Sequence, residues 1–426
     1  MKKELMNIAE FMKNNINSDD FSIYVNYNDE QCTRFAQNSI TQHISGDYID
    51  VYCVCVKEKK IGTATTRQID ETNLLQTIRK AEEIAHNNSP DNDTVASLSK
   101  EDYVEIKNYF PSIESLDTSK IIEIIKKCID FAEAKQGFLS GILTKSISET
   151  VFMTKNGFLG YNKYSEIELS MTLRKDHIET KVTFTNKDFE KLDVDKILAN
   201  LDAQFEALKE MRSMDFETIP VILRPQAVEQ LFMFFNWYMF NRKNADEGLT
   251  PFTNQIGKKF LGEKYSCASI IDDPDLTTSP FSSNNVNRTM QWVKNGVINN
   301  LPTSRQWAQK HGLEPSTMFN MIVEGEGVSE NDMMKMVKRG LIVNNLWYIR
   351  LNDMKSADFT GMTRDGVMYF EDGEVKYAVN NFRFNEQIHE VTKRILATGK
   401  CVQQSTNVKV PAMLIDAFTF VDKTTF

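Results

Sequence analysis

Residues 226–241 are almost wholly apolar and have the length of a short helix. A helix without a polar stripe has no face that suits water, so protein must enclose it on nearly all sides. Its longest apolar run, residues 231–240 with Asn236 inside it, is about half of the roughly 20 residues that a membrane span requires. The sequence therefore predicts a buried central helix in a globular domain.

The chain after Gly257 has the pattern of short strands separated by Gly, Asn and Pro, with one predicted helix at 330–338. Its clearest hairpin places Asp372-Gly373 between the apolar stretches 367–370 and 375–379. An Asp-Gly pair supplies the positive φ angles of a tight turn. We expect a twisted, barrel-like antiparallel sheet wrapped around the apolar helix.

The first half of the chain mixes helical and strand patterns. Residues 167, 169, 171 and 173 are apolar and alternate with polar ones, which is typical of an antiparallel sheet with one face in water. The predicted helices are 3–14, 71–86, 118–134 and 193–211, and the predicted strands are 21–27, 33–37, 50–56, 61–66, 141–149, 151–156, 166–174 and 178–186.

These patterns indicate an α+β fold class with two domains. The first, residues 1–217, is an N-terminal α+β domain with an antiparallel sheet. The second, residues 218–426, is a C-terminal barrel-like antiparallel β domain around the buried apolar helix. The step Thr218-Ile219-Pro220 marks the boundary.

Composition excludes several classes of function. The 426-residue chain is 41% hydrophobic and 26% charged, as in an ordinary globular protein, and its formal net charge of -9 would repel a nucleic acid. No apolar signal-peptide core follows MKKELMNIAEFMKNN, and six scattered cysteines suit a reducing compartment. We expect a cytoplasmic protein with no nucleic-acid or membrane partner.

Several segments resemble the TldD/PmbA family in the order in which that family has them. The final hairpin, EDGEVKYAVNNFRFNE, is similar to the family's C-terminal signature, and WVKNGVINNLPTSRQWAQKHG resembles a family segment in which Arg305, Ala308 and Gly312 take the matching places. The resemblance implies either a TldD-type zinc peptidase or a PmbA-type (TldE) partner of one.

The zinc motif separates these two types. In TldD members, H-E-x-x-x-H on a helix holds the metal and supplies a glutamate as proton acceptor. The matching positions here are Met233, Phe234 and Tyr238, which replace the two ligands and the glutamate. Met suits soft metals, Tyr is a rare ligand and Phe cannot move a proton. We therefore expect no catalytic residue in this chain, and zinc only in a partner subunit.

Two further segments resemble functional positions of the family, but each also has a purely structural explanation. Cys401 lies in the region of the family's third zinc ligand, but the sequence favours a small residue near a strand end and makes Cys401 only a weak metal candidate. Asp272-Asp273 before Pro274 resembles a family strand end, but the preference of Asp for turns favours a solvated turn.

Tyr348, Arg350 and Arg364 are our candidates for peptide contact, because aromatic and guanidinium groups suit peptide binding and carboxylate capture. The alternative is a core tyrosine and two surface arginines. The family substrate pairs as an added strand, and the β-rich half offers backbone groups for such pairing.

The predicted function is thus a non-catalytic, PmbA-like subunit of a zinc metallopeptidase complex that processes peptides. The partner would be a TldD-like zinc-bearing subunit, or a second copy of the chain in a dimer. Two alternatives stay open: a metallopeptidase with a rearranged metal site, and a homodimeric peptide-binding module.

Overall fold

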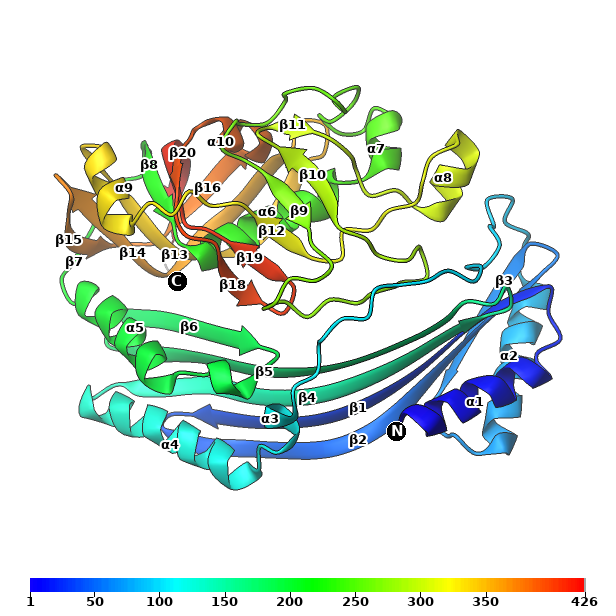
Figure 1. The fold of residues 1–426 in the computed structure, drawn as a ribbon. Coiled ribbons are helices and arrows are strands. Elements are labelled where there is room, and N and C mark those ends of the chain that lie inside the picture. The colour runs from blue at the N-terminus through cyan, green and yellow to red at the C-terminus, as the bar shows by residue number, and fades with distance from the viewer. Residues whose placement is uncertain (425–426) are drawn as a thin grey trace.

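The computed structural model describes residues 1–424, whose strands form three sheets (Figure 1). One long, curved sheet belongs to the N-terminal half, and the two others build the C-terminal half, which lies over the first (Figure 1). The predicted α+β class is confirmed. No helix within residues 1–424 is long and apolar enough to cross a membrane.

The N-terminal sheet is antiparallel and has the strand order β3-β2-β1-β4-β5-β6. Its elements in chain order are α1 Lys2–Asn15, β1 Asp20–Ala36, β2 Ser39–Lys57, β3 Lys60–Thr66, α2 Glu71–Asn87, α3 Pro111–Glu114, α4 Thr118–Ala134, β4 Phe138–Thr154, β5 Leu159–Lys175, β6 Ile178–Asn186, a 3-10 turn Phe189–Lys191 and α5 Val194–Ala207.

Strand β1 corrects one prediction. We expected two strands, 21–27 and 33–37, separated by a polar stretch, but β1 is one strand of 17 residues. It pairs with β2 on one side and β4 on the other through the polar middle of the strand. Hydrogen bonds to these two neighbouring strands satisfy the backbone N–H and C=O groups of β1. The polar side chains of residues 26–31 gave no sign of this pairing. For the same reason β4 is one strand where we expected two.

Helices cover one face of this sheet. Near one end, α1 and α2 pack over a cluster that includes Ile23, Val51 and Val151. Near the other end, α4 and α5 pack over a second cluster that includes Leu143 and Leu169. Figure 1 shows α4 along the lower side of the sheet, α5 beside β6, and the C-terminal half above the sheet. The face that we expected in water is therefore turned towards the C-terminal half.

The C-terminal half is built from a larger and a smaller sheet. Its elements are β7 Met211–Arg212, β8 Thr218–Leu223, α6 Pro225–Met239, α7 Arg242–Asp246, β9 Cys267–Ser269, β10 Met290–Lys294, β11 Val297–Ile298, α8 Arg305–His311, β12 Met321–Val323, α9 Glu330–Met336, β13 Arg339–Asp353, β14 Asp358–Glu371, β15 Glu374–Val379, β16 Phe382–Gln387, α10 Ile388–Lys393, β17 Ile395–Thr398, β18 Val402–Ser405, β19 Val408–Val410 and β20 Met413–Lys423.

The larger sheet closes on itself. Its order runs β13-β8-β20-β16-β14, and β14 pairs back with β13. This ring is mostly antiparallel, with one parallel pair between β8 and β13. The expected barrel-like sheet is therefore confirmed. Closing the ring pairs both edges of these five strands, while β15 and β7 continue the sheet beyond β14.

Helix α6 lies between the barrel and the smaller sheet β11-β10-β9-β12-β19-β18. Leu231, Phe232 and Phe235 are fully buried in the C-terminal core. The helix is nevertheless less enclosed than we predicted, because Met233 is exposed and Trp237 is 79% exposed. Composition alone gave no sign of this open side, since Met233 and Trp237 are themselves apolar.

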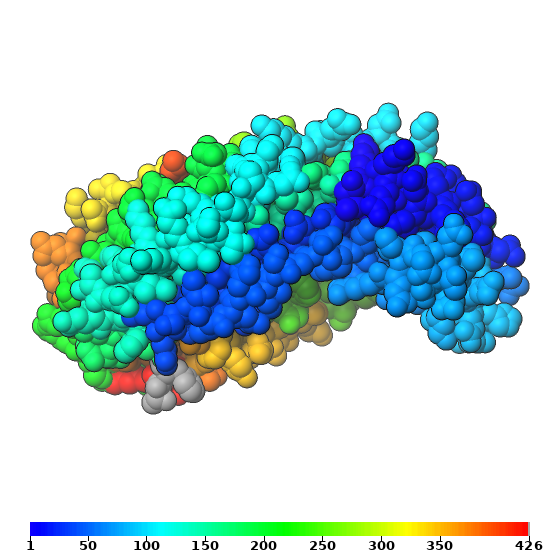
Figure 2. Space-filling view, turned by 90° about the horizontal axis from the view of Figure 1, so that it is seen from below, coloured from blue at the N-terminus to red at the C-terminus, as the bar shows by residue number. Residues whose placement is uncertain are grey.

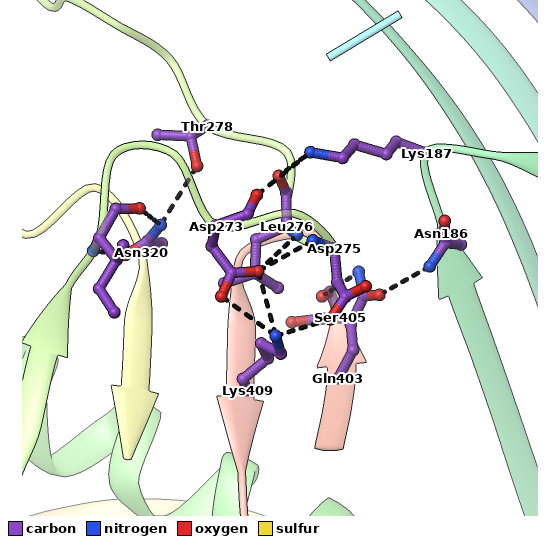
Figure 3. Close-up of polar contacts among 11 residues, drawn as sticks. Asn186, Lys187, Asp273, Asp275, Leu276, Thr278, Asn320, Gln403, Ser405 and Lys409 are labelled. Atoms are coloured by element: carbon purple, nitrogen blue, oxygen red, sulfur yellow. Dashed lines mark hydrogen bonds and ion pairs between the residues drawn. The ribbon is translucent and has the colours of Figure 1, made fainter. Parts of the chain in front are cut away.

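A buried polar junction joins the two halves (Figure 3). Lys187 at the end of β6 is buried and donates to the carbonyl oxygens of Asp273 and Leu276, at 3.3 and 2.9 Å. Lys409 pairs with the carboxylates of Asp273 and Asp275, at 3.1 and 2.7 Å. Asp273 is therefore buried and charge-paired, and the solvated turn that we expected was wrong for it. Of the pair Asp272-Asp273, Asp272 is the exposed residue.

Gly62 in β3 provides a test of how tightly α2 packs on the sheet. A Cβ atom at Gly62 would lie 2.0 Å from the backbone oxygen of Ala81 in α2. We expect Gly62→Ala to destabilise the protein by about 2 kcal/mol, because backbone must move to admit the methyl group. Gly46→Ala is the control, since a Cβ there meets nothing within 4 Å. Equal midpoints for both variants in urea unfolding would contradict this packing.

Candidate functional site

Trp347 and Tyr348 are neighbours in β13, and both are exposed, by 46% and 51%. In a regular strand, successive side chains point to opposite faces. Here the pairing with β14 is irregular between Trp347 and Arg350, and Tyr348 has a φ of 54°. Positive φ is uncommon for a bulky residue, and such outliers concentrate at functional sites. The irregularity thus presents two aromatic rings to solvent.

An arginine guanidinium stacks on each of the two rings. The Arg350 guanidinium lies 4.3 Å from the centre of the Tyr348 ring, and that of Arg364 lies 4.3 Å from the Trp347 ring. The two rings are 5.9 Å apart. The three residues predicted for peptide contact therefore lie together with Trp347. We call Trp347, Tyr348, Arg350 and Arg364 the aromatic–arginine cluster.

Arg364 also lines a cleft of about 700 Å³ between the two halves of the chain. The β5–β6 hairpin forms one wall, with His177 in its turn and Glu179 in β6, and β14 and β15 form the other. Arg364 lies 3.6 Å from the carboxylates of both Glu179 and Asp365. Arg364 therefore belongs both to the aromatic–arginine cluster and to the wall of the cleft.

Asp365 is the most strongly buried carboxylate of this cleft, with 5% of the residue exposed. Burial raises its pKa, and the nearby Glu179 adds to this, while a hydrogen bond from Asn345 and the charge of Arg364 oppose it. Asp365 and the following Gly366 have φ angles of 56° and 109°. A second irregular turn of the chain therefore places this carboxyl group in the cleft wall.

Further carboxyl groups lie where the polar face of the N-terminal sheet approaches the C-terminal half. Glu229, on the open side of α6, has its pKa raised by burial; a hydrogen bond with Ser405 opposes the shift, and the charge of Glu168 in β5 adds to it. Glu166 in β5 also has its pKa raised by burial. Carboxyl groups from both halves thus meet between the sheet and the helix, in a setting that favours their neutral form.

The residues at the expected zinc positions do not fit a zinc ion. Met233 is exposed, Phe234 is partly buried against the C-terminal core, and the Tyr238 ring packs 6.1 Å from that of Phe359. None offers an imidazole or a carboxylate. Within residues 1–424, no group of three or more His, Cys, Asp or Glu side chains is arranged to hold a metal ion. That zinc belongs to a partner stays a prediction.

Cys401 lies between β17 and β18 and is partly buried. Burial raises its pKa to about 11, so that the thiol stays protonated at neutral pH. A cysteine binds a metal ion as the thiolate, and burial disfavours the thiolate form of Cys401. The position does not assemble with any histidine or acidic group into a metal site within the described residues.

Sequence reasoning missed Trp347, Asp365 and Lys187. Trp347 gave no signal, because only the irregular pairing turns it to solvent. The dipeptide Asp365-Gly366 was a visible turn signal directly before the predicted strand 367–370, and it could have been read as an irregularity. Lys187 is polar and stands beside a strand end, so nothing in the sequence distinguished it from a surface lysine.

Residues 217–422 match the family model described as PmbA/TldA metallopeptidase C-terminal domain. The chain is a member of the TldD/PmbA family. The matched region starts beside β8 and extends into β20, so it contains α6, the aromatic–arginine cluster and Cys401. The comparison with curated proteins found no match.

Solved structures share the fold of this TldD/PmbA chain over nearly its whole length. TldE from Thermococcus kodakarensis is 18% identical, with a TM-score of 0.86 over 98% of this chain and 100% of that one. A protein from Thermotoga maritima proposed as a modulator of a DNA gyrase is 16% identical, with a TM-score of 0.82 over 99% of both. One from Bacteroides thetaiotaomicron, proposed as a modulator of DNA gyrase, is 13% identical, with a TM-score of 0.85 over 99% and 98%.

The raised pKa of Asp365 makes stability depend on pH. A carboxyl group whose pKa is raised by folding stabilises the fold below its unfolded-state pKa, and this contribution is lost as pH rises through the folded-state pKa. Asp365→Asn should therefore be more stable than the parent chain at neutral pH, and this gain should shrink as pH falls towards about 4.

Urea unfolding at several pH values measures this difference. Asp215→Asn is the control, because Asp215 is exposed and its pKa is lowered by Lys423. The control should show no gain at neutral pH. A pH-independent effect of Asp365→Asn would mean that its charge is not disfavoured in the cleft.

Proposed function

We propose that this chain is a non-catalytic subunit, of the PmbA/TldE type, in a TldD-type zinc metallopeptidase complex that processes peptides. The observation that supports the proposal is that α6, which the resemblance matches to the family's zinc helix, has Met233, Phe234 and Tyr238 at the matching positions and no imidazole or carboxylate there. The likeness to the structure described as TldE supports the same assignment.

The aromatic–arginine cluster is the part that we assign to peptide contact. Guanidinium groups bind carboxylates and peptide carbonyl oxygens, and exposed aromatic rings supply apolar contact area at low entropic cost. Stacking on Tyr348 and Trp347 holds both arginines in place before a peptide arrives. Preorganised groups bind with a smaller loss of conformational freedom.

The partner would supply the zinc and the proton acceptor, and this chain would supply a wall of the peptide chamber. The polar face of β5 and the open side of α6 form such a wall, with carboxyl groups at Glu166 and Glu229. A cytoplasmic location fits this proposal, since all six cysteines are free thiols.

Reconstitution with a zinc-bearing TldD-type chain tests the assignment. We expect the purified chain to bind substoichiometric zinc and to leave an unfolded peptide intact, while the mixture hydrolyses it. The control mixture contains a zinc-bearing chain whose motif glutamate is replaced by glutamine, and it should be inactive. Stoichiometric zinc that is lost in Cys401→Ser, with hydrolysis by this chain alone, would instead support a rearranged metal site.

Substitutions in the cluster test peptide contact. We expect Arg350→Gln and Arg364→Gln each to weaken binding of a labelled unfolded peptide by about tenfold, or about 1.4 kcal/mol, because each removes a stacked cation. The matched control is Arg67→Gln, since Arg67 stacks on Tyr48 at 4.1 Å in the N-terminal half. Fluorescence anisotropy gives the affinities. Unchanged binding in both cluster variants would remove these residues from the peptide site.

A further inference from the structure

Arg305, at the start of α8, is a partly buried cation with unused hydrogen-bonding capacity. Its Nη2 donates to the backbone oxygen of Ala96 at 2.6 Å, while its Nη1 is buried and has no hydrogen-bond partner within residues 1–424. Burial lowers the pKa of Arg305, although the charges of Asp20 and Glu101 oppose the shift. Of these two carboxylates, Glu101 pairs with Arg288 at 2.6 Å. A buried charge is costly unless it is paired, so this guanidinium is suited to bind an anionic group.

A pocket of about 230 Å³ lies beside this guanidinium, between the two halves of the chain. The N-terminal sheet contributes Val54, Val56 and Ile61, and the C-terminal half contributes Ser283 and Arg305. α8 and β3 accordingly lie at the same end of the molecule (Figure 1). Figure 2 shows the opposite side of this end, where the blue residues of α1 and the lighter blue residues of α2 cover the sheet. Sites for drug-sized ligands begin at about 300 Å³, so this pocket suits a smaller molecule.

Asp20 supplies a negative charge in the same pocket. Its carboxylate accepts hydrogen bonds from the backbone N–H and the hydroxyl of Ser97, both at 2.6 Å, and from the N–H of Phe21 at 2.7 Å. These bonds fix the carboxylate, which has about four acceptor positions and so keeps room for one more donor. Asp20 and Arg305 are the charged residues of the lining. A simple anion would be repelled by Asp20 and a simple cation by Arg305, whereas a zwitterion is attracted by both.

We propose that this pocket binds a free α-amino acid with a short apolar side chain. The carboxylate of the amino acid would pair with Arg305, because guanidinium and carboxylate groups form strong charge-assisted hydrogen bonds. The ammonium group would donate to Asp20, and the side chain would contact Val54, Val56 and Ile61. A residue within a peptide chain carries neither of these charges on its backbone. The pocket would therefore select the free amino acid over an internal peptide segment.

This pocket lies apart from the proposed peptide site. Strands β1, β2 and β3 contribute to it, whereas β6, the strand beside the interdomain cleft, lies at the other edge of the sheet. The aromatic–arginine cluster lies on β13 and β14, which contribute no residue to the pocket lining. Amino-acid binding therefore does not depend on the proposed peptide-processing role.

Isothermal titration calorimetry of the purified full chain with L-valine and L-leucine tests this site. We expect saturable binding of one amino acid per chain. Arg305→Gln and Asp20→Asn should each weaken this binding at least about tenfold, because each removes a charge-assisted hydrogen bond. The matched control is Arg288→Gln, which removes a neighbouring guanidinium that is 63% exposed and does not line the pocket. It should bind valine like the parent chain.

Ligand analogues supply a second readout that needs no variant. Isovalerate lacks the ammonium group of valine and valinamide lacks its carboxylate, so each should bind the parent chain at least about tenfold more weakly than valine. This comparison decides the question even if Arg305→Gln unfolds. Three results would each overturn the proposal: no saturable binding of valine or leucine, equal affinity for valine and isovalerate, or an unchanged affinity for valine in folded Arg305→Gln.

Discussion

The burial of α6 between the barrel and the smaller sheet is the constraint on which the C-terminal half depends. The inner side of this helix supplies Leu231, Phe232 and Phe235 to a core that both sheets share. Because the larger sheet closes through the β13–β14 pairing, its inner residues face one enclosed volume, and residues such as Val343 and Phe359 complete it. Removing bulk from the helix would therefore affect both sheets together.

The same packing decides which groups remain available for function. α6 packs against β13, where Gln230 accepts a hydrogen bond from the backbone of Leu346 at 2.7 Å. Directly after this contact, β13 leaves regular pairing and exposes Trp347 and Tyr348. The open side of α6, the irregular part of β13 and the polar face of β5 belong to one region between the two halves. If a related chain carried zinc ligands on this helix, the metal would face the same region. The proposed non-catalytic role therefore concerns the region between the two halves.

Particular residues show how far sequence reasoning reaches. Local signals predicted α4 at its observed bounds, because Asp117 caps it and isoleucines recur at helical spacing. The hairpin turn at Asp372-Gly373 was predicted from the same kind of signal, and both residues have positive φ. The lengths of β1 and β4 were not predicted, since pairing with neighbours far along the chain stabilises polar stretches that look like loops. The buried state of Asp273 depends on Lys187 and Lys409, which are distant in sequence.

The sequence by itself determined the α+β class, the apolar helix, the barrel-forming half and the lack of zinc ligands at positions 233, 234 and 238, because these follow from residue type and local spacing. Only the tertiary structure decided that Tyr348, Arg350 and Arg364 lie together with Trp347, and that Trp237 stays exposed. The physical reason is that exposure and side-chain contact depend on irregular strand pairing and on which surface another element covers. Neither is encoded by the periodicity of a single segment.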